Sequence, residues 1–176
     1  MNTAIVLSIY LYKLTKLRRK PMNKPKITDL LISVLIAELV GALSGVIAGD
    51  ISGTYALLNK PPLSPPGWVF PAVWAALYAL MGISAYLIYT AESPKKGCAF
   101  AIYAAQLFLN FTWSIVFFRF QAYGAAAAVL AALIIAVVIM LVCFARIRPA
   151  AAVINIPYLL WLMFAAYLNI ATGLLN

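Results

Sequence analysis

The sequence has no histidine, four acidic residues and two cysteines among its 176 residues. Without histidine, a Ser-His-Asp triad and histidine-ligated haem are excluded. Cys98 and Cys143 are too far apart for a CxxC motif, so the spacing typical of zinc sites is also absent. The scarcity of carboxylates argues further against ordinary acid-base catalysis.

Charged residues as a whole are scarce, at 10% of the chain, whereas 66% of residues are hydrophobic and the mean hydropathy is +1.01. A soluble domain of this size could not bury so much apolar surface, but a bilayer accepts it. The 13 Lys and Arg residues lie mainly before and between apolar runs, which is typical of membrane topology signals. We therefore predict an integral membrane protein that contacts lipid and not nucleic acid.

Five apolar runs are long enough to cross a hydrocarbon core of about 30 Å at about 1.5 Å per residue. They cover Ile27–Ala48, 68–90, 98–118, Tyr123–Ala145 and 151–174. Most links between the runs are short, which forces neighbouring helices to be antiparallel. The prediction is an all-α integral membrane fold, a five-transmembrane-helix bundle formed by residues 27–176 as one domain.

The exception among the links is segment 49–67, which contains four prolines in the string PPLSPP. Proline locks φ and pushes the preceding residue toward extended geometry. We expect a semi-rigid extramembrane loop there, which is a candidate lid.

The distribution of basic residues predicts the orientation. With a cytoplasmic N-terminus, that side carries 11 Lys and Arg against two on the other side. The long loop and the C-terminus then lie outside the cell membrane of a prokaryote. Residues 1–26 form a basic N-terminal extension, either an interfacial segment attracted to anionic lipid or a stretch upstream of a translation start at Met22.

Glu38 lies in the middle of the first span, roughly on the face that carries Gly41 and Gly45. We expect it to point into the bundle, where an ionisable group is costly and is a default functional candidate. The alternative is a protonated or hydrogen-bonded packing residue that never meets a ligand. Small residues at spacings of four also allow close approach of helices, within the bundle or in a dimer.

Three spans carry aromatic residues, and two of these also carry amides, at spacings of three or four residues, so that each set shares one helix face. The faces comprise Phe70, Trp74, Tyr78 and Met81 on the second span, Tyr103, Gln106, Asn110, Trp113 and Phe117 on the third, and Tyr158, Trp161, Ala165 and Asn169 on the fifth. Together they could line a cavity for a large planar ligand with a few polar edges. Alternatively, the two amides of the third span only hold the bundle together by interhelical hydrogen bonds.

Three strings occur in the order of one known family: YALLNKPPLSPPGWVFPAVWAALYALMG from Tyr55, QLFLNFTWSIVFF from Gln106 and PYLLWLMFAAYLN from Pro157. Over residues 27–174 the sequence resembles the TspO/MBR family, which comprises translocator proteins, tryptophan-rich sensory proteins and the peripheral-type benzodiazepine receptor.

The resemblance implies a five-helix bundle, usually a homodimer, that binds tetrapyrroles such as protoporphyrin IX, with no covalently bound cofactor. Animal members also bind cholesterol and benzodiazepine-type ligands, but the Tyr followed by Lys or Arg of their cholesterol motif is missing here, since the chain reads LNIATGLLN from Leu168. The expected ligand contacts are Tyr55, Pro65, Phe70, Trp74, Tyr78, Gln106, Asn110, Trp113, Tyr158, Trp161 and Ala165, with Glu38 as a further candidate.

Three classes of function remain. The first choice is a membrane receptor or sensor that binds tetrapyrroles. One alternative is an enzyme that degrades porphyrins with light or oxygen through Trp74 and Trp161, although four tryptophans are few for such chemistry. The other is a transporter of porphyrins or other small molecules, for which Pro71 and Pro157 are the notable helix interruptions.

Overall fold

The computed structural model describes residues 26–176, and this part of the chain is helical without any strand. It contains five helices that are long and apolar enough to cross a membrane, as predicted. The elements are α2 (Ile27–Ala48), α3 (Ile51–Leu57), α4 (Val69–Thr90), α5 (Lys96–Ser114) with its extension η1 (Ile115–Arg119), α6 (Tyr123–Ala145), α7 (Pro149–Val153) and α8 (Ile156–Leu175). The predicted basic extension lies, except for Lys26, outside the described residues.

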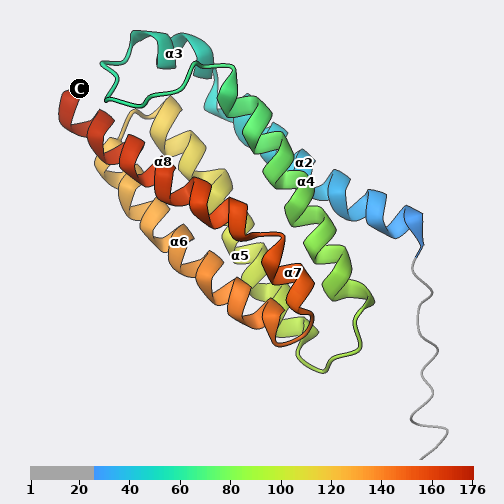
Figure 1. Ribbon diagram of the computed structural model, residues 1–176. Coiled ribbons are helices and arrows are strands. Elements are labelled where there is room, and N and C mark those ends of the chain that lie inside the picture. The colour runs from blue at the N-terminus through green and yellow to red at the C-terminus, as the bar shows by residue number, and fades with distance from the viewer. Residues whose placement is uncertain (1–25) are drawn as a thin grey trace, which may run out of the picture.

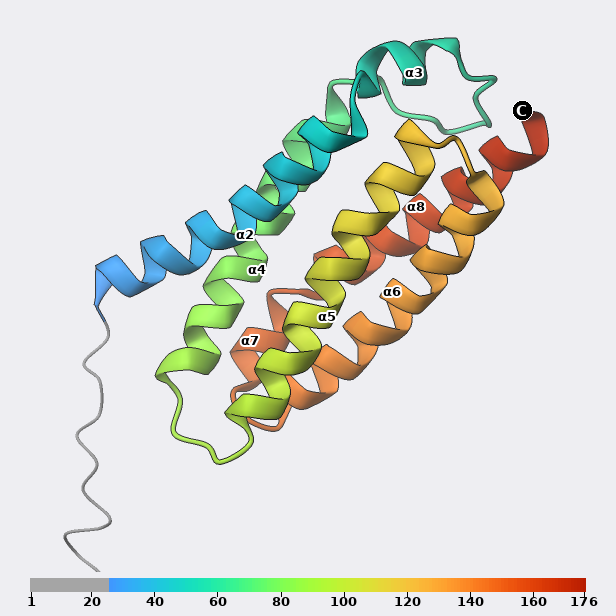
Figure 2. The same cartoon turned by 180° about the vertical axis from the view of Figure 1, so that it is seen from behind.

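The long helices run side by side in an elongated bundle (Figures 1 and 2). Helix α2 packs mainly against α4, while α6 packs against α5 and α8. The α3 segment, the link between η1 and α6, and the C-terminus lie at one end of the bundle, and the links that follow α4 and α6 lie at the other (Figure 1). We call these the loop end and the opposite end.

Small residues bring α2 and α4 into close contact. A Cβ on Gly82 of α4 would lie 2.5 Å from the Cα of Val34, so the two backbones touch at this point. About two turns farther along α2, a Cβ on Gly41 would overlap the ring of Tyr78. The absence of a side chain at both positions therefore allows α2 and α4 to approach this closely.

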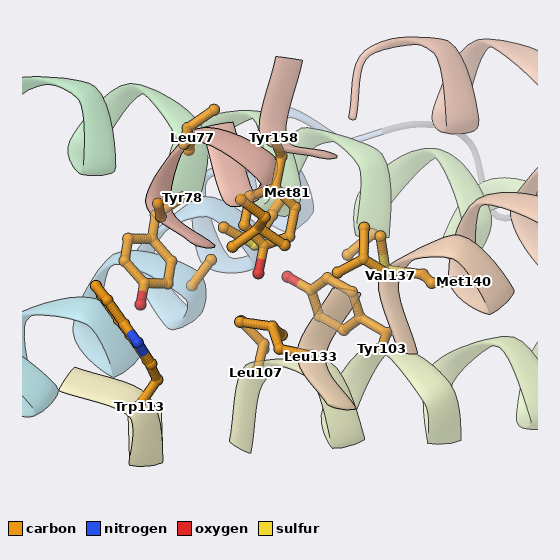
Figure 3. Close-up of a cluster of buried hydrophobic side chains, with 14 of the residues drawn as sticks. Leu77, Tyr78, Met81, Tyr103, Leu107, Trp113, Leu133, Val137, Met140 and Tyr158 are labelled. Carbon is orange, nitrogen blue, oxygen red and sulfur yellow. The ribbon is translucent and has the colours of Figure 1, made fainter. Parts of the chain in front are cut away.

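The core consists mainly of aromatic, aliphatic and methionine side chains from α4, α5, α6 and α8 (Figure 3), with smaller contributions from α2, η1 and α7. The opposite faces of the helices are also apolar, with Leu31, Leu35 and Leu39 of α2 more than half exposed. Such a surface is unfavourable in water and is expected for helices that face lipid.

Three segments differ from the sequence-based boundaries. The link 49–67 is not only loop, because it contains α3, whose first turn is capped by the Asp50 carboxylate accepting a hydrogen bond from the Gly53 backbone nitrogen at 2.8 Å. The third span ends in the π-helical turn η1. The fifth span is divided into α7 and α8 just before Pro157, whose missing N–H cannot continue the helical ladder.

Candidate ligand-binding cavity

A cavity of about 430 Å³ lies between α2, α4 and the α5–η1 helix, with α3 at its outer end. Its walls include six of the residues singled out in the sequence: Glu38, Tyr55, Phe70, Trp74, Tyr78 and Trp113. Except for Glu38, these are aromatic side chains. The cavity is therefore mainly apolar, and its volume lies within the range of about 300–1,000 Å³ that is usual for small-molecule sites.

The aromatic walls are held by contacts among the rings. Trp74 lies 5.8 Å from Tyr78 and 6.1 Å from Trp113 between ring centroids, and Tyr55 meets the edge of Phe70 at 5.0 Å. Such pairs are worth about 0.5–1.5 kcal/mol each beyond the buried area. A wall of rings that support one another is rigid enough to present flat faces to a planar ligand.

Tyr55 also joins α3 to the proline-rich segment. Its hydroxyl donates a hydrogen bond to the carbonyl oxygen of Pro65 at 2.7 Å, and the Lys60 ammonium lies 4.8 Å from the centre of its ring. Burial raises the pKa of the Tyr55 phenol, and the nearby Ser64 side chain partly offsets this shift. The hydroxyl therefore remains protonated, and a donor to Pro65, throughout the neutral range.

The proline-rich segment is also attached to the last helix. Tyr167 of α8 donates a hydrogen bond to the carbonyl oxygen of Pro62 at 2.8 Å. The Asn59 backbone nitrogen donates to the Asn176 side-chain oxygen at 3.0 Å, and the Asn176 amide donates to the Asn59 carbonyl oxygen at 3.1 Å. The segment thus spans the loop end of the bundle from α3 to α8. Its opening and closing as a lid stays a prediction.

Outside the cavity proper, a recess of about 580 Å³ is formed by α3, the prolines and the start of α4, and Pro65 and Lys60 are among its walls. It shares Ser52, Tyr55, Gly67 and Pro71 with the cavity. The two spaces therefore adjoin at Tyr55, and we call the recess the mouth because it lies on the loop-end side of the cavity.

The amides of α5 lie behind the cavity wall in a buried hydrogen-bond network. Tyr78 donates to the Asn110 side-chain oxygen at 3.3 Å, and the Asn110 amide donates to the Tyr158 hydroxyl at 2.9 Å. Tyr158 in turn donates to the Gln106 side-chain oxygen at 2.9 Å, and Gln106 contacts the sulfur of Met81. These amides and Tyr158 are fully buried and connect α4, α5 and α8.

None of Gln106, Asn110 and Tyr158 is among the walls of the three cavities described here for residues 26–176. The structure thus joins these residues to one another and to Tyr78, which does line the cavity. Through Tyr78, the network fixes one wall from behind. Direct contact of the three residues with a ligand stays a prediction.

The remaining predicted residues belong to α8. Trp161 lies against Phe70 with 6.0 Å between ring centroids, and its indole nitrogen is buried without a hydrogen-bond partner among the described residues. Ala165 lines a small cavity of about 30 Å³ whose walls include Tyr55, Phe70 and Trp113. Shared side chains therefore separate the small cavity from the larger one.

Several cavity residues were missed in the sequence. Ile51 and Ser52 were treated as loop, although the capping residue Asp50 signals the start of a helix. Phe118 was missed because the α-helical period assigns Phe117 to the face of Trp113. The π turn η1 widens the winding there, so that both phenylalanines are buried beside Trp113.

Glu38 is the acidic member of the cavity wall. It is half-buried, and within residues 26–176 no ion pair or hydrogen bond of its carboxylate is found. No group of three or more side chains that could hold a metal ion occurs in the same part of the chain. The aromatic wall with one carboxylate suits an organic ligand held by stacking and by a small number of polar contacts.

Comparison with known proteins places these features in a family. The model of the TspO/MBR family matches residues 33–175. The chain is 36% identical to the tryptophan-rich protein TspO of Chlorobaculum tepidum over 124 residues, which cover 69% of this chain and 78% of that protein. It is 38% identical to the tryptophan-rich sensory protein of Cereibacter sphaeroides over 122 residues, covering 69% and 76% of the two chains.

The similarity extends to animals, since the human translocator protein is 36% identical over 118 residues, which cover 65% of this chain and 70% of that protein. The matched residues include the first span from residue 33 onward, the proline-rich segment and the other four spans. The chain is an integral, multi-pass membrane protein, and it belongs to the TspO/MBR family.

Proposed function

We propose that the protein is a membrane receptor or sensor that binds tetrapyrroles such as protoporphyrin IX in the cavity between α2, α4 and α5. The observation that carries the proposal is the aromatic wall of Trp74, Tyr78 and Trp113, placed at membrane depth in a chain of the TspO/MBR family. A flat, largely apolar macrocycle gains free energy both from leaving water and from stacking on such rings.

The charges at the mouth support an orientation for this ligand. Lys60 is a cation of the outer recess, whereas Glu38 lies farther in, on the wall of the cavity. Carboxylate side groups of a porphyrin would be attracted to Lys60 and repelled by Glu38. We therefore place the acidic edge of the macrocycle toward the loop end and its apolar edge in the membrane.

The test is a titration of the purified protein with protoporphyrin IX in lipid nanodiscs, followed by quenching of tryptophan fluorescence. We expect saturable binding that weakens about tenfold or more in Trp74→Ala, because an aromatic wall of the cavity is removed. Phe108→Ala is the matched control, since Phe108 is an aromatic residue on the exposed face of α5. Equal binding by wild type and both variants would refute the assignment of the cavity.

The orientation in the membrane is also a proposal. The opposite end carries Lys26, Lys95, Lys96, Arg146 and Arg148, whereas the loop end carries Lys60 and Arg119. By the excess of basic residues, the opposite end faces the cytoplasm and the proline-rich segment faces outward. Similarity to the family further leads us to propose a homodimer, which light scattering of the detergent complex would reveal as a doubled protein mass.

A further inference from the structure

The carboxylate of Glu38 has no partner of its own among the described residues, although it lies about midway along a membrane-spanning helix. It is ten residues from the end of α2 at Ala48, which corresponds to roughly 15 Å along the helix axis. Lys60 and Arg119 lie at the loop end, and Arg119 already donates to the carbonyl oxygen of Ile47 at 2.9 Å. No cation within residues 26–176 forms an ion pair with Glu38.

The hydroxyl of Tyr78 does not donate a hydrogen bond to Glu38 either. Tyr78 lines the same cavity as Glu38. However, Tyr78 has one hydroxyl proton, and this proton is donated to Asn110. The cavity therefore contains a hydrogen-bond acceptor without an assigned donor, and an acceptor at membrane depth is unfavourable unless a partner is supplied.

The surroundings of Glu38 indicate what kind of partner would fit. The cavity wall beside it includes Trp74, Tyr78 and Trp113, and the faces of aromatic rings carry negative potential. A carboxylate and several ring faces around one space form a combination that attracts cations. Ring faces also select flat ligands, so the combination favours a planar aromatic compound with a protonated nitrogen.

We propose that the inner end of the cavity is a subsite for a protonated nitrogen on a planar aromatic ligand, with the Glu38 carboxylate accepting a hydrogen bond from the cationic N–H group and the rings of Trp74 and Tyr78 packing against the ligand. The proposal rests on the proposed function only in that both place a ligand in the same cavity. Amine binding does not require that tetrapyrroles bind.

The site is then polarised along its length. A cationic group binds at Glu38 in the membrane, and an anionic group binds near Lys60 at the mouth. This polarity distinguishes two classes of ligand, because neutralising Glu38 weakens binding of the amine but relieves repulsion of an acidic porphyrin.

The test uses the full chain in nanodiscs of phosphatidylcholine, whose zwitterionic surface adds no net charge, with empty nanodiscs subtracted. The probes are 9-aminoacridine, which is protonated at neutral pH, and acridine, its largely neutral counterpart, with binding followed by equilibrium dialysis. We expect wild type to bind the cation at least about tenfold more tightly than the neutral ring, since a charge-assisted hydrogen bond is present in one case only.

In Glu38→Gln, which keeps the shape of the side chain, this preference should disappear. Glu92→Gln is the matched control, because Glu92 is an exposed carboxylate in the link after α4, away from the cavity, and its preference should equal that of wild type. Glu38→Asp, which keeps the charge, should retain part of the preference.

An unchanged preference in Glu38→Gln would overturn the proposal. If that variant does not fold, equal binding of the two probes by wild type overturns the proposal by itself. Protoporphyrin IX is titrated in parallel. If protoporphyrin IX does not bind to wild type, the proposed function is refuted. If the cation preference that depends on Glu38 is nevertheless observed, the amine subsite remains supported.

Discussion

The contact between α2 and α4 at Gly82 leads to a prediction that joins stability to the cavity. In Gly82→Ala, the new methyl group would lie 2.5 Å from the Cα of Val34 and 2.8 Å from the carbonyl oxygen of Ser33. Favourable contacts between such atoms occur at about 3.5–4.0 Å, so α2 would have to move away by roughly 1 Å. The obstacle is backbone, which cannot turn aside as the end of a side chain can.

We expect a loss of about 1–3 kcal/mol in the free energy of unfolding, the usual range for overpacking of a tight interface. The higher helix propensity of alanine opposes this loss by at most about 1 kcal/mol. Because α2 forms one wall of the cavity, its displacement should also weaken binding of protoporphyrin IX.

The assay is reversible unfolding in mixed micelles with increasing SDS, followed by circular dichroism. Gly124→Ala in α6 is the matched control, because a Cβ there would meet no atom within 4 Å. Its stability should be unchanged or slightly raised. If Gly82→Ala is as stable as Gly124→Ala, the close approach of α2 and α4 does not hold and the described shape of the cavity is wrong.

Three further predictions concern the network, the alternative function and the proline-rich segment. Asn110→Ala should lower the free energy of unfolding by about 1–3 kcal/mol in the same SDS assay, because two buried tyrosine hydroxyls lose a partner, and an unchanged midpoint would contradict this role. If the protein degrades porphyrin under light, the double variant Trp74→Phe and Trp161→Phe should slow the bleaching of bound protoporphyrin IX, whereas an equal rate would show that the protein takes no part in the photochemistry. Protease added outside intact cells should cut within residues 51–59 more slowly when protoporphyrin IX is bound, because ligand would hold α3 over the cavity. If the segment is cut only by protease on the cytoplasmic side, the proposed orientation is wrong. If protease outside the cell cuts it at the same rate with and without saturating ligand, the segment does not act as a lid.

The amino-acid sequence by itself determines the number of spans and the membrane environment, because hydropathy is a sum over neighbouring residues. The first and fourth spans begin and end where the sequence predicts, at Ile27–Ala48 and Tyr123–Ala145. Helical periodicity also identifies Phe70, Trp74 and Tyr78 as one face of α4, which does line the cavity. Membership of the TspO/MBR family is likewise indicated by the three strings that begin at Tyr55, Gln106 and Pro157, in that order.

Helix endings and interruptions are harder to predict from the sequence, since they depend on single hydrogen bonds. The cap that begins α3 and the π turn that follows α5 each change which residues face the cavity, and neither changes the hydropathy of its segment. The break between α7 and α8 had a visible signal in Pro157, although its position at residues 154–155, two to three residues earlier, depends on the local turn.

Tertiary structure alone decides how the residues of one helix face are divided between cavity and core. Asn110 and Trp113 share a face of α5, but Asn110 is enclosed by Tyr78 and Tyr158 while Trp113 reaches the cavity. Periodicity specifies a direction around one helix, and what lies in that direction depends on the packing of the others. Glycine at position 41 lets α2 approach Tyr78, and this approach places the carboxylate of Glu38 in the wall of an aromatic cavity.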